Sequence, residues 1–251
     1  MAEITVATLN LYNRAGRWGE RAPLLVDQFV ELLPDVIGLQ EVDLVIDQGN
    51  WLVHLVNSRL GQPTYRIHHV TSPGRLAPWL ANAVVTRLPV LAHEGLDLLS
   101  GERMAQGVRL ETADGAFDLY NTHLHHPLDA AELRCEQVRR LVDWLTKWGD
   151  DNPRAVVGDF NARPDEPAVA LMKGRLRSAH EAAHGHEPEK TWPTPINTDD
   201  RDPPGCLDYI FVGGAEVKEC RLAFDRPHEY DPTLYPSDHL GLVARLSFPA
   251  R

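Results

Sequence analysis

The chain has 251 residues, of which 43% are hydrophobic, a fraction that supports a substantial globular core. Its 36 acidic residues outnumber the 25 basic ones, and the net charge of −11 argues against tight, sequence-independent binding of DNA. No apolar run approaches the length of a transmembrane helix, and the three cysteines lack metal-ligand spacing. We therefore expect one cytoplasmic domain over residues 1–251, with no stable membrane anchor and no obligate protein partner.

The first part of the chain predicts a strand, a helix and a second strand. Residues 4–11 alternate as a strand that reaches Asn10. Residues 22–33 have an amphipathic helical pattern, and residues 36–39 are an apolar strand that runs into Glu41. Beyond them we predict a helix over residues 51–60, a loop over 74–80, and strands over 65–69, 82–86, 90–98 and 107–110.

A similar strand, helix and strand follow in the middle of the chain. Residues 117–121 form a strand after the hairpin turn at Asp114-Gly115, and a helix that runs to about Trp148 begins at a capping box of Asp129 and Glu132. A buried strand over residues 155–157 comes next. The remainder predicts a short helix over 167–174, a loop over 180–205, and strands over 207–212, 217–222 and 240–248. This pattern indicates a two-sheet core with helices outside.

Polar residues gather at the ends of these strands. Asp159 and Asn161 follow the buried strand with the spacing that places two side chains on one side of an extended chain. Both are hard oxygen ligands, suited to Mg²⁺ or to orienting a water molecule, although a turn that simply closes the strand is an alternative interpretation. The full set at predicted strand ends is Asn10, Glu41, His123, Asp159, Asn161, Asp208, Asp238 and His239. Carboxylates, carboxamides and histidines together favour metal-assisted hydrolysis of a phosphoester.

A series of short motifs spans residues 4–248 in one order. They are Thr8-Leu9-Asn10, Gln40-Glu41, Asn121-Thr122-His123-Leu124, Gly158-Asp159-Phe160-Asn161, Leu207-Asp208-Tyr209-Ile210 and Ser237-Asp238-His239. The series resembles that of the DNase I-like endonuclease/exonuclease/phosphatase superfamily. The resemblance implies an α/β fold, a four-layered sandwich in which two mixed β-sheets pack face to face with helices outside. It also implies a Mg²⁺-dependent phosphodiester hydrolase, for which Mn²⁺ is a possible substitute.

The resemblance further implies a role for each strand-end residue. Glu41, helped by Asn10, would hold the metal, with Asp238 touching it directly or through water. Asp208 would orient His239 as the general base, for which Asp159 is a rival. Asp159 and Asn161 would position the water and the phosphoryl group. His123 would stabilise the transition state or aid the leaving oxygen.

Two departures from the superfamily's motifs argue against an AP endonuclease. Tyr12 stands where some of those enzymes have an acid, and His123 stands where they use a tyrosine. The substrate therefore stays open among nucleic acid, a phospholipid headgroup and a small phosphoester. A phosphomonoesterase acting on a small or inositol-type phosphate, and a catalytically silent binding module, are the alternative functions.

Several other residues have both a functional and a structural interpretation. Arg87, His125 and Trp79 are candidates for binding substrate, although an arginine beside a strand is more often in a structural ion pair and a loop tryptophan often fills a minor apolar cluster. His180-Glu181-Ala182-Ala183-His184 matches the zinc protease pattern HExxH. Because it lies in a predicted loop, we interpret that match as accidental.

Overall fold

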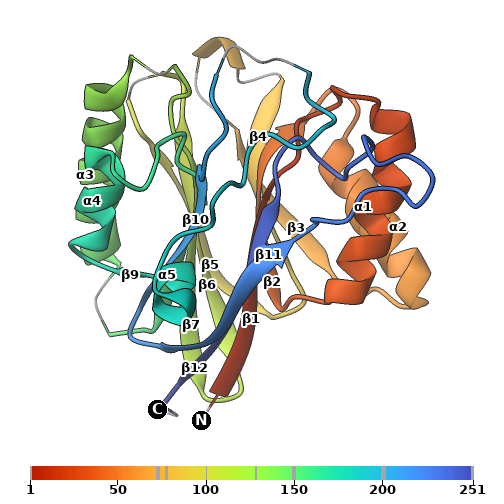
Figure 1. Ribbon diagram of the computed structural model, residues 1–251. Coiled ribbons are helices and arrows are strands. Elements are labelled where there is room, and N and C mark those ends of the chain that lie inside the picture. The colour runs from red at the N-terminus through yellow and green to blue at the C-terminus, as the bar shows by residue number, and fades with distance from the viewer. Residues whose placement is uncertain are drawn as a thin grey trace.

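The computed structural model describes residues 2–71, 74–76, 79–99, 101–127, 129–148, 151–198 and 202–249. Two mixed six-stranded sheets pack face to face, and helices lie on their outer sides (Figure 1). This architecture confirms the α/β sandwich expected from the motif series.

The first sheet has the strand order β11-β12-β1-β2-β4-β3, with helices α1 and α2 on its outer side (Figure 1). The bounds are β1 (Ala2–Asn10), α1 (Trp18–Leu32), β2 (Val36–Asp43), α2 (Gln48–Leu60), β3 (Arg66–Thr71), β4 (Leu80–Thr86), β11 (Glu216–Ala223) and β12 (Gly241–Phe248). A 3₁₀ turn, η1 (Gly74–Leu76), lies between β3 and β4.

The second sheet has the order β5-β6-β7-β8-β10-β9, with α3 and α4 on its outer side (Figure 1). The bounds are β5 (Val90–Asp97), β6 (Met104–Thr112), β7 (Gly115–His123), α3 (Ala131–Lys147), β8 (Arg154–Asp159), α4 (Pro167–Lys173), β9 (Arg177–Ser178), α5 (Ala179–His184) and β10 (Asp208–Gly213).

Each sheet contains one parallel pair of strands joined by a helix. In the first sheet β1 pairs with β2, with Asn10 opposite Gln40; in the second, β7 pairs with β8, with His123 opposite Asp159. Because parallel strands end at the same edge, the two strand-helix-strand units each deliver polar residues to one edge of their sheet. The antiparallel strand β10 starts at that edge too, since Asp208 lies opposite Asp159.

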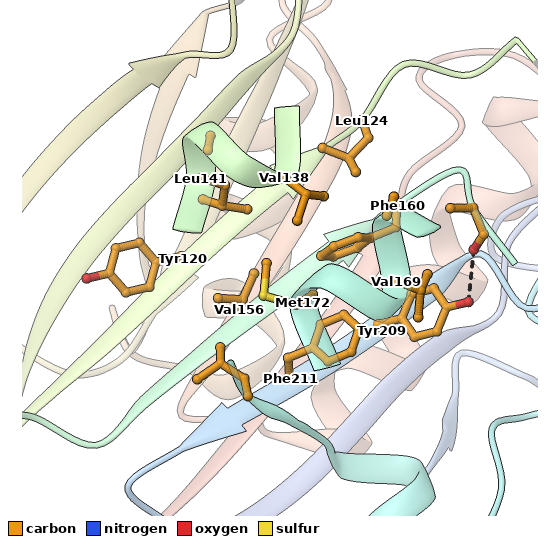
Figure 2. Close-up of a cluster of buried hydrophobic side chains, with 14 of the residues drawn as sticks. Tyr120, Leu124, Val138, Leu141, Val156, Phe160, Val169, Met172, Tyr209 and Phe211 are labelled. Atoms are coloured by element: carbon orange, nitrogen blue, oxygen red, sulfur yellow. Dashed lines mark hydrogen bonds between the residues drawn. The ribbon is translucent and has the colours of Figure 1, made fainter. Parts of the chain in front are cut away.

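Apolar side chains fill three layers. One lies between the sheets and includes Val6, Val108 and Val157. A second packs α1 and α2 on the first sheet. The third packs α3 and α4 on the second sheet, where Val138, Leu141 and Met172 meet the strand residues Val156 and Phe211 (Figure 2). Burial of these side chains supplies the main driving force for holding the four layers together.

A polar clasp crosses the interface between the sheets. The Asn121 side chain on β7 donates from Nδ2 to the carbonyls of Leu39 and Ala83, both at 2.9 Å, and accepts from Gln40 Nε2 at 2.7 Å. Asn121 and Gln40 are fully buried, so these hydrogen bonds are made in a low-dielectric environment. The clasp holds β7 at a fixed height against β2 and β4.

Three local expectations differ from the structure. Helix α3 begins after Ala130, with no side-chain hydrogen bond at its N-cap, so the capping box of Asp129 and Glu132 is not formed. Helix α1 begins at Trp18, four residues before the predicted start, and continues through Pro23. Part of the predicted loop over 180–205 is the short helix α5, which Ser178 caps by accepting from the amide of Glu181.

Candidate active site

The polar strand ends of both sheets meet around a cavity of about 200 Å³. Of the strand-end residues predicted from sequence, all but Asp208 line it, and Asp208 lies directly behind His239. The lining residues are Asn10, Tyr12, Glu41, His123, His126, Asp159, Asn161, Arg163, Trp192, Asp202, Pro203, Leu207, Asp238 and His239. The structure therefore brings together eight residues that come from six separate segments of the chain.

A row of three buried side chains forms the centre of the site. His239 Nδ1 lies 2.8 Å from Asp208 Oδ2, and its other nitrogen, Nε2, lies 3.7 Å from Asp159 Oδ2. A carboxylate oxygen can only accept, so the ring donates from Nδ1 to Asp208. The imidazole thus has a carboxylate on each side, in the arrangement of an acid or base with an orienting partner.

The electrostatics of this row differ from those of free side chains. Burial lowers the pKa of His239, but the charges of Asp208, Asp159 and Asp238 outweigh burial and raise it well above its usual value. Burial raises the pKa of Asp159 to about 7, despite the opposing effects of His239 and of a hydrogen bond from Asn10. Both groups thus have raised pKa values, and because His239 Nε2 and Asp159 Oδ2 lie 3.7 Å apart, the titration of one depends on the charge of the other.

His123 faces the same carboxylate in a different state. Burial, followed by the charge of Arg103, holds the pKa of His123 well below its usual range, so the ring is neutral. Arg103 Nη1 lies 3.2 Å from His123 Nδ1, and because a guanidinium can only donate, Nδ1 accepts and Nε2 carries the proton. That Nε2 lies 3.5 Å from Asp159 Oδ2 at the cavity wall. His123 is thus set as a neutral hydrogen-bond donor.

Glu41 reaches the cavity through an irregularity in β2. The β2–β4 pairing shifts register between Leu39 and Val42, and Glu41 has the left-handed φ of 54°. A bulge of this kind turns a side chain out of the regular alternation of a strand, and a non-glycine residue in this conformation carries strain. Asn13 Nδ2 donates to Glu41 Oε2 at 2.8 Å, which leaves Oε1 available.

The carboxamides and Asp238 complete the wall. Asn10 Nδ2 donates to Asp159 Oδ2 at 3.0 Å, and the backbone amide of Asn161 donates to Asp159 Oδ1 at 2.8 Å. Asp238 accepts from Trp192 Nε1 at 3.2 Å and from Asn197 Nδ2 at 3.1 Å, while burial raises its pKa. Each acid is therefore oriented by at least one fixed donor.

The three predicted substrate-binding residues lie outside the cavity. Arg87 follows β4 at the end of that strand away from the site and pairs with Asp35 at 2.8 Å. The ring of His125 is not part of the cavity wall, where its neighbour His126 is found instead. Trp79 is 52% exposed beside the start of β4, near the site but outside its lining.

Several lining or supporting residues come from outside the strand ends predicted from sequence. Trp192, Arg163 and His126 come from loops, and Arg103 precedes β6. Arg103 is 8% exposed and places one guanidinium nitrogen on His123 and the other 3.3 Å from His126 Nδ1. An arginine buried beside two histidines can be recognised only once the fold brings it there.

A sequence model of the Endonuclease/Exonuclease/phosphatase family matches residues 7–239, nearly the full length of the chain. The chain belongs to this family. Endonucleases, exonucleases and phosphatases are all phosphoric ester hydrolases, which places the chain in that enzyme class.

Curated relatives of the chain within the Endonuclease/Exonuclease/phosphatase family include Nocturnin. The Homo sapiens protein is 28% identical over 265 residues, covering 92% of this chain and 59% of the relative. The Drosophila melanogaster protein is 27% identical over 260 residues, covering 93% and 38%. The chain thus spans well under two thirds of the length of these relatives.

Solved structures agree with this assignment. The human Nocturnin catalytic domain with a bound sulfate anion has a TM-score of 0.78 and 25% identity, covering 98% of this chain and 94% of that one. An endonuclease/exonuclease/phosphatase from Bacteroides vulgatus has a TM-score of 0.80 and 20% identity, covering 99% and 100%. The latter likeness supports the fold.

The Endonuclease/Exonuclease/phosphatase family implies a divalent metal, and the donor set of this chain fits one. One ligand atom each from Asp159, Asp208 and His239 lie within 4.8 Å of one another. Asp208 Oδ1 is buried without a hydrogen-bond partner in the described residues. Together with Glu41 and Asp238, these carboxylates concentrate negative charge at one buried point, and their oxygens are hard ligands. A divalent cation would offset that charge and favour the ionised form of Asp159.

Proposed function

We propose that the protein hydrolyses a phosphodiester with the help of a bound divalent cation, Mg²⁺ or alternatively Mn²⁺. The observation that carries this proposal is the buried row Asp208–His239–Asp159 at the wall of the cavity. The row can accept a proton from an attacking water, and the described cavity wall contains no serine or cysteine side chain that would replace water as the nucleophile.

His239 and Asp159 form the base machinery in this proposal. His239 acts from its neutral form, in which Nε2 takes the proton of a water molecule while Asp208 stabilises the resulting imidazolium through the 2.8 Å hydrogen bond to Nδ1. Asp159, whose pKa of about 7 suits proton transfer at neutral pH, is the rival acceptor of the same proton. Asn10 and the amide of Asn161 hold its carboxylate in place.

His123 stabilises the negative charge that develops on the substrate. Its protonated Nε2 donates to a phosphoryl oxygen or to the leaving oxygen as negative charge develops there. Arg103 keeps this proton on Nε2 by occupying Nδ1. Removing one preorganised donor of this kind costs about 10²–10³ in turnover number in other hydrolases.

Glu41 and Asn10, with Asp238 directly or through water, would hold the cation. When bound, the cation supplies Lewis-acid stabilisation of the charge on the phosphoryl oxygens. The hydrogen bond from Asn13 orients Glu41 for this task and leaves one carboxylate oxygen for the ligand.

The substrate is a phosphodiester whose esterified group is nucleic acid, a phospholipid headgroup or a small organic group. The human Nocturnin catalytic domain binds a sulfate anion, which is tetrahedral like a phosphate group. Arg163, His126 and Trp192 line the outer wall, where they can contact what lies beyond the phosphate.

No helix in the described part of the chain is long and apolar enough to span a bilayer. A cytoplasmic location stays a prediction.

Hydrolysis of bis-p-nitrophenyl phosphate, compared with p-nitrophenyl phosphate, tests the proposal. We expect cleavage of the diester that depends on Mg²⁺ or Mn²⁺ and stops with EDTA. Cleavage of the monoester alone would contradict the diester and indicate a phosphomonoesterase. Diester cleavage that EDTA leaves intact would contradict the metal. If the protein hydrolyses neither of these compounds, nor DNA, RNA or sphingomyelin in the presence of Mg²⁺, the result would favour a binding module.

A further inference from the structure

Three histidines gather at α5 and the turn that follows it, outside the catalytic cavity; two of them are exposed and one, His180, is 9% exposed. They are His180 and His184, one helical turn apart on α5, and His186 just beyond its end. The ring centres lie 4.4 Å apart for His180 and His184, 5.7 Å for His180 and His186, and 6.2 Å for His184 and His186. No role in phosphoester hydrolysis accounts for this grouping.

Each of the three rings is bonded to a backbone carbonyl through one nitrogen. His180 Nδ1 lies 2.8 Å from the carbonyl oxygen of His186, His184 Nε2 lies 2.6 Å from that of Cys220, and His186 Nδ1 lies 2.7 Å from that of Glu187. A carbonyl oxygen can only accept, so each of these nitrogens carries a proton. Each neutral ring therefore has a lone pair on its second nitrogen: Nε2 of His180, Nδ1 of His184 and Nε2 of His186.

A histidine ring whose one nitrogen donates to a carbonyl has the same hydrogen bonding as many histidines that bind metals. Histidines that bind metals commonly donate their other N–H to a backbone carbonyl or a carboxylate, which fixes the tautomer. Within the described residues, the second nitrogens of these three rings make no hydrogen bond. The cluster thus offers three unpaired imidazole donors and no cysteine thiolate, a set that suits Zn²⁺, Ni²⁺ or Cu²⁺ better than Mg²⁺.

The spacing of the rings also fits one ion. Three imidazoles bound tetrahedrally at ~2.0–2.1 Å from zinc place their ring centres about 5 Å apart. The observed separations, 4.4 to 6.2 Å, lie on both sides of that value. The three free nitrogens are not all within 4.8 Å of one another in this structure. On binding a metal, the exposed His186 side chain would turn to bring a nitrogen toward the other two and would give up its 2.7 Å hydrogen bond to the Glu187 carbonyl.

Protease chemistry does not follow from the HExxH spacing. The glutamate that such an enzyme uses as a base, here Glu181, is instead paired with Lys173 at 2.8 Å on the surface. The helix is six residues long, which leaves no extended helical frame to present a substrate cleft. The metal would therefore have a structural role, joining α5 to the turn after it.

We propose that His180, His184 and His186 form a transition-metal site that takes Zn²⁺ or an ion of similar preference. Because His184 also bonds the carbonyl of Cys220 on β11, the bound ion would tie α5 to the edge strand of the first sheet. The fourth position is open to water.

Isothermal titration calorimetry tests this site: Zn²⁺ is titrated into the full chain in the presence of excess Mg²⁺. The variant His184→Gln with His186→Gln removes two ligands, and His54→Gln with His69→Gln removes two other exposed histidines as the matched control. We expect wild type and the control to bind one Zn²⁺ at least tenfold more tightly than the first variant. The melting temperature should rise with Zn²⁺ in the same two proteins only.

Two further measurements separate this site from the catalytic one. Mg²⁺-dependent diester hydrolysis should be unchanged in His184→Gln with His186→Gln, which shows that the fold is intact. Electron paramagnetic resonance of bound Cu²⁺ should report nitrogen ligands in wild type and fewer in that variant. An identical zinc isotherm in the variant would overturn the proposal. So would loss of the tight isotherm in Asp159→Asn with the three histidines in place, because the zinc would then belong to the catalytic centre.

Discussion

Two of the three histidines that line the cavity, His239 and His123, face the carboxylate of Asp159 but have pKa values shifted in opposite directions. His239 sits among three acids and has a raised pKa, whereas His123 has Arg103 on its other side and a lowered one. We therefore expect the same kind of side chain to act as a proton carrier in one position and as a fixed hydrogen-bond donor in the other. The neighbour on Nδ1, Asp208 or Arg103, decides which.

Replacing His239 tests the first of these roles. We expect His239→Ala to lower kcat for the diester by about 10²–10⁴, because the attacking water loses its proton acceptor. The circular dichroism spectrum should stay that of wild type. His54→Gln, a change to an exposed histidine on α2, serves as the control and should keep full activity. Near-normal turnover in His239→Ala would assign the base to Asp159 instead.

Glu41 is the residue through which the metal proposal can be tested alone. Glu41→Gln keeps the shape of the side chain and its bulge but removes the charge, so we expect the Mg²⁺ concentration for half-maximal activity to rise by about tenfold or more. The titration curve of rate against Mg²⁺ measures this. A curve that stays in place would show that Glu41 does not bind the metal.

At the residue level, the sequence predicts what strand ends carry but not what loops bring to them. Asn10, Glu41, His123, Asp159 and His239 each follow or precede an apolar run, so their pattern is local. The lining residues Trp192 and Arg163 reach the cavity through loop paths that no periodicity encodes. Arg87 was placed wrongly because a single sequence does not tell which end of β4 faces the site.

Among the elements, β8 makes a close backbone approach to its neighbour β7. Its Gly158 has a φ of 139°, and a Cβ atom there would lie 1.9 Å from the carbonyl oxygen of Thr122 on β7. The two parallel strands approach closely at this point, one residue before Asp159 and His123. The glycine thereby sets how near the side chains of Asp159 and His123 lie.

Gly158→Ala should consequently destabilise the protein and displace Asp159. We expect a loss of unfolding free energy of about 2–4 kcal/mol, from backbone strain and overlap. Chemical denaturation measures the loss. Gly19→Ala on α1 is the control, because a Cβ there meets nothing within 4 Å and alanine favours helix. Equal stability of the two variants would contradict the close approach.

Element boundaries show where local reasoning works and where packing overrides it. Apolar runs identify the central strands because both faces of those strands are buried. The start of α3 depends on tertiary placement: its N-cap is Ala130, although Asp129 and Glu132 offer a capping box. Helix α5 lies in a segment rich in proline, glycine and histidine, and its contacts with β11 stabilise a helix that its own sequence favours weakly.

Across the whole molecule, the outer edges of the two sheets meet at a pair of histidines. His68 on β3 and His93 on β5 have ring centres 5.5 Å apart, and Gln106 Nε2 bonds both the carbonyl of His68 and Nε2 of His93. Burial is the main effect that lowers the pKa of both histidines, followed by Arg66 for His68 and by His68 itself for His93. The folded state therefore favours the neutral form of both histidine rings at this edge.

This pair predicts how stability depends on pH. A histidine with a depressed pKa in the folded state contributes stability fully above its unfolded value of 6.5 and loses it as the pH falls through the folded value. We expect the unfolding free energy to decrease from pH 7 to pH 5, and His68→Gln with His93→Gln to flatten this slope. Urea denaturation at several pH values measures both. An unchanged slope in the variant would exclude the pair as its source.

Both halves of the chain contribute strands to both sheets, and this matters if the protein is cut into two fragments. Cutting it at the Asp114-Gly115 turn would leave Asn10 and Glu41 on one fragment and His123, Asp159, Asp208 and His239 on the other. Each fragment would also lack strands of both sheets, since β12 belongs beside β1 and β6 beside β7. Neither half could hold the site, but both could restore it by reassociating, so the enzyme offers a natural split reporter whose signal is its own catalysis.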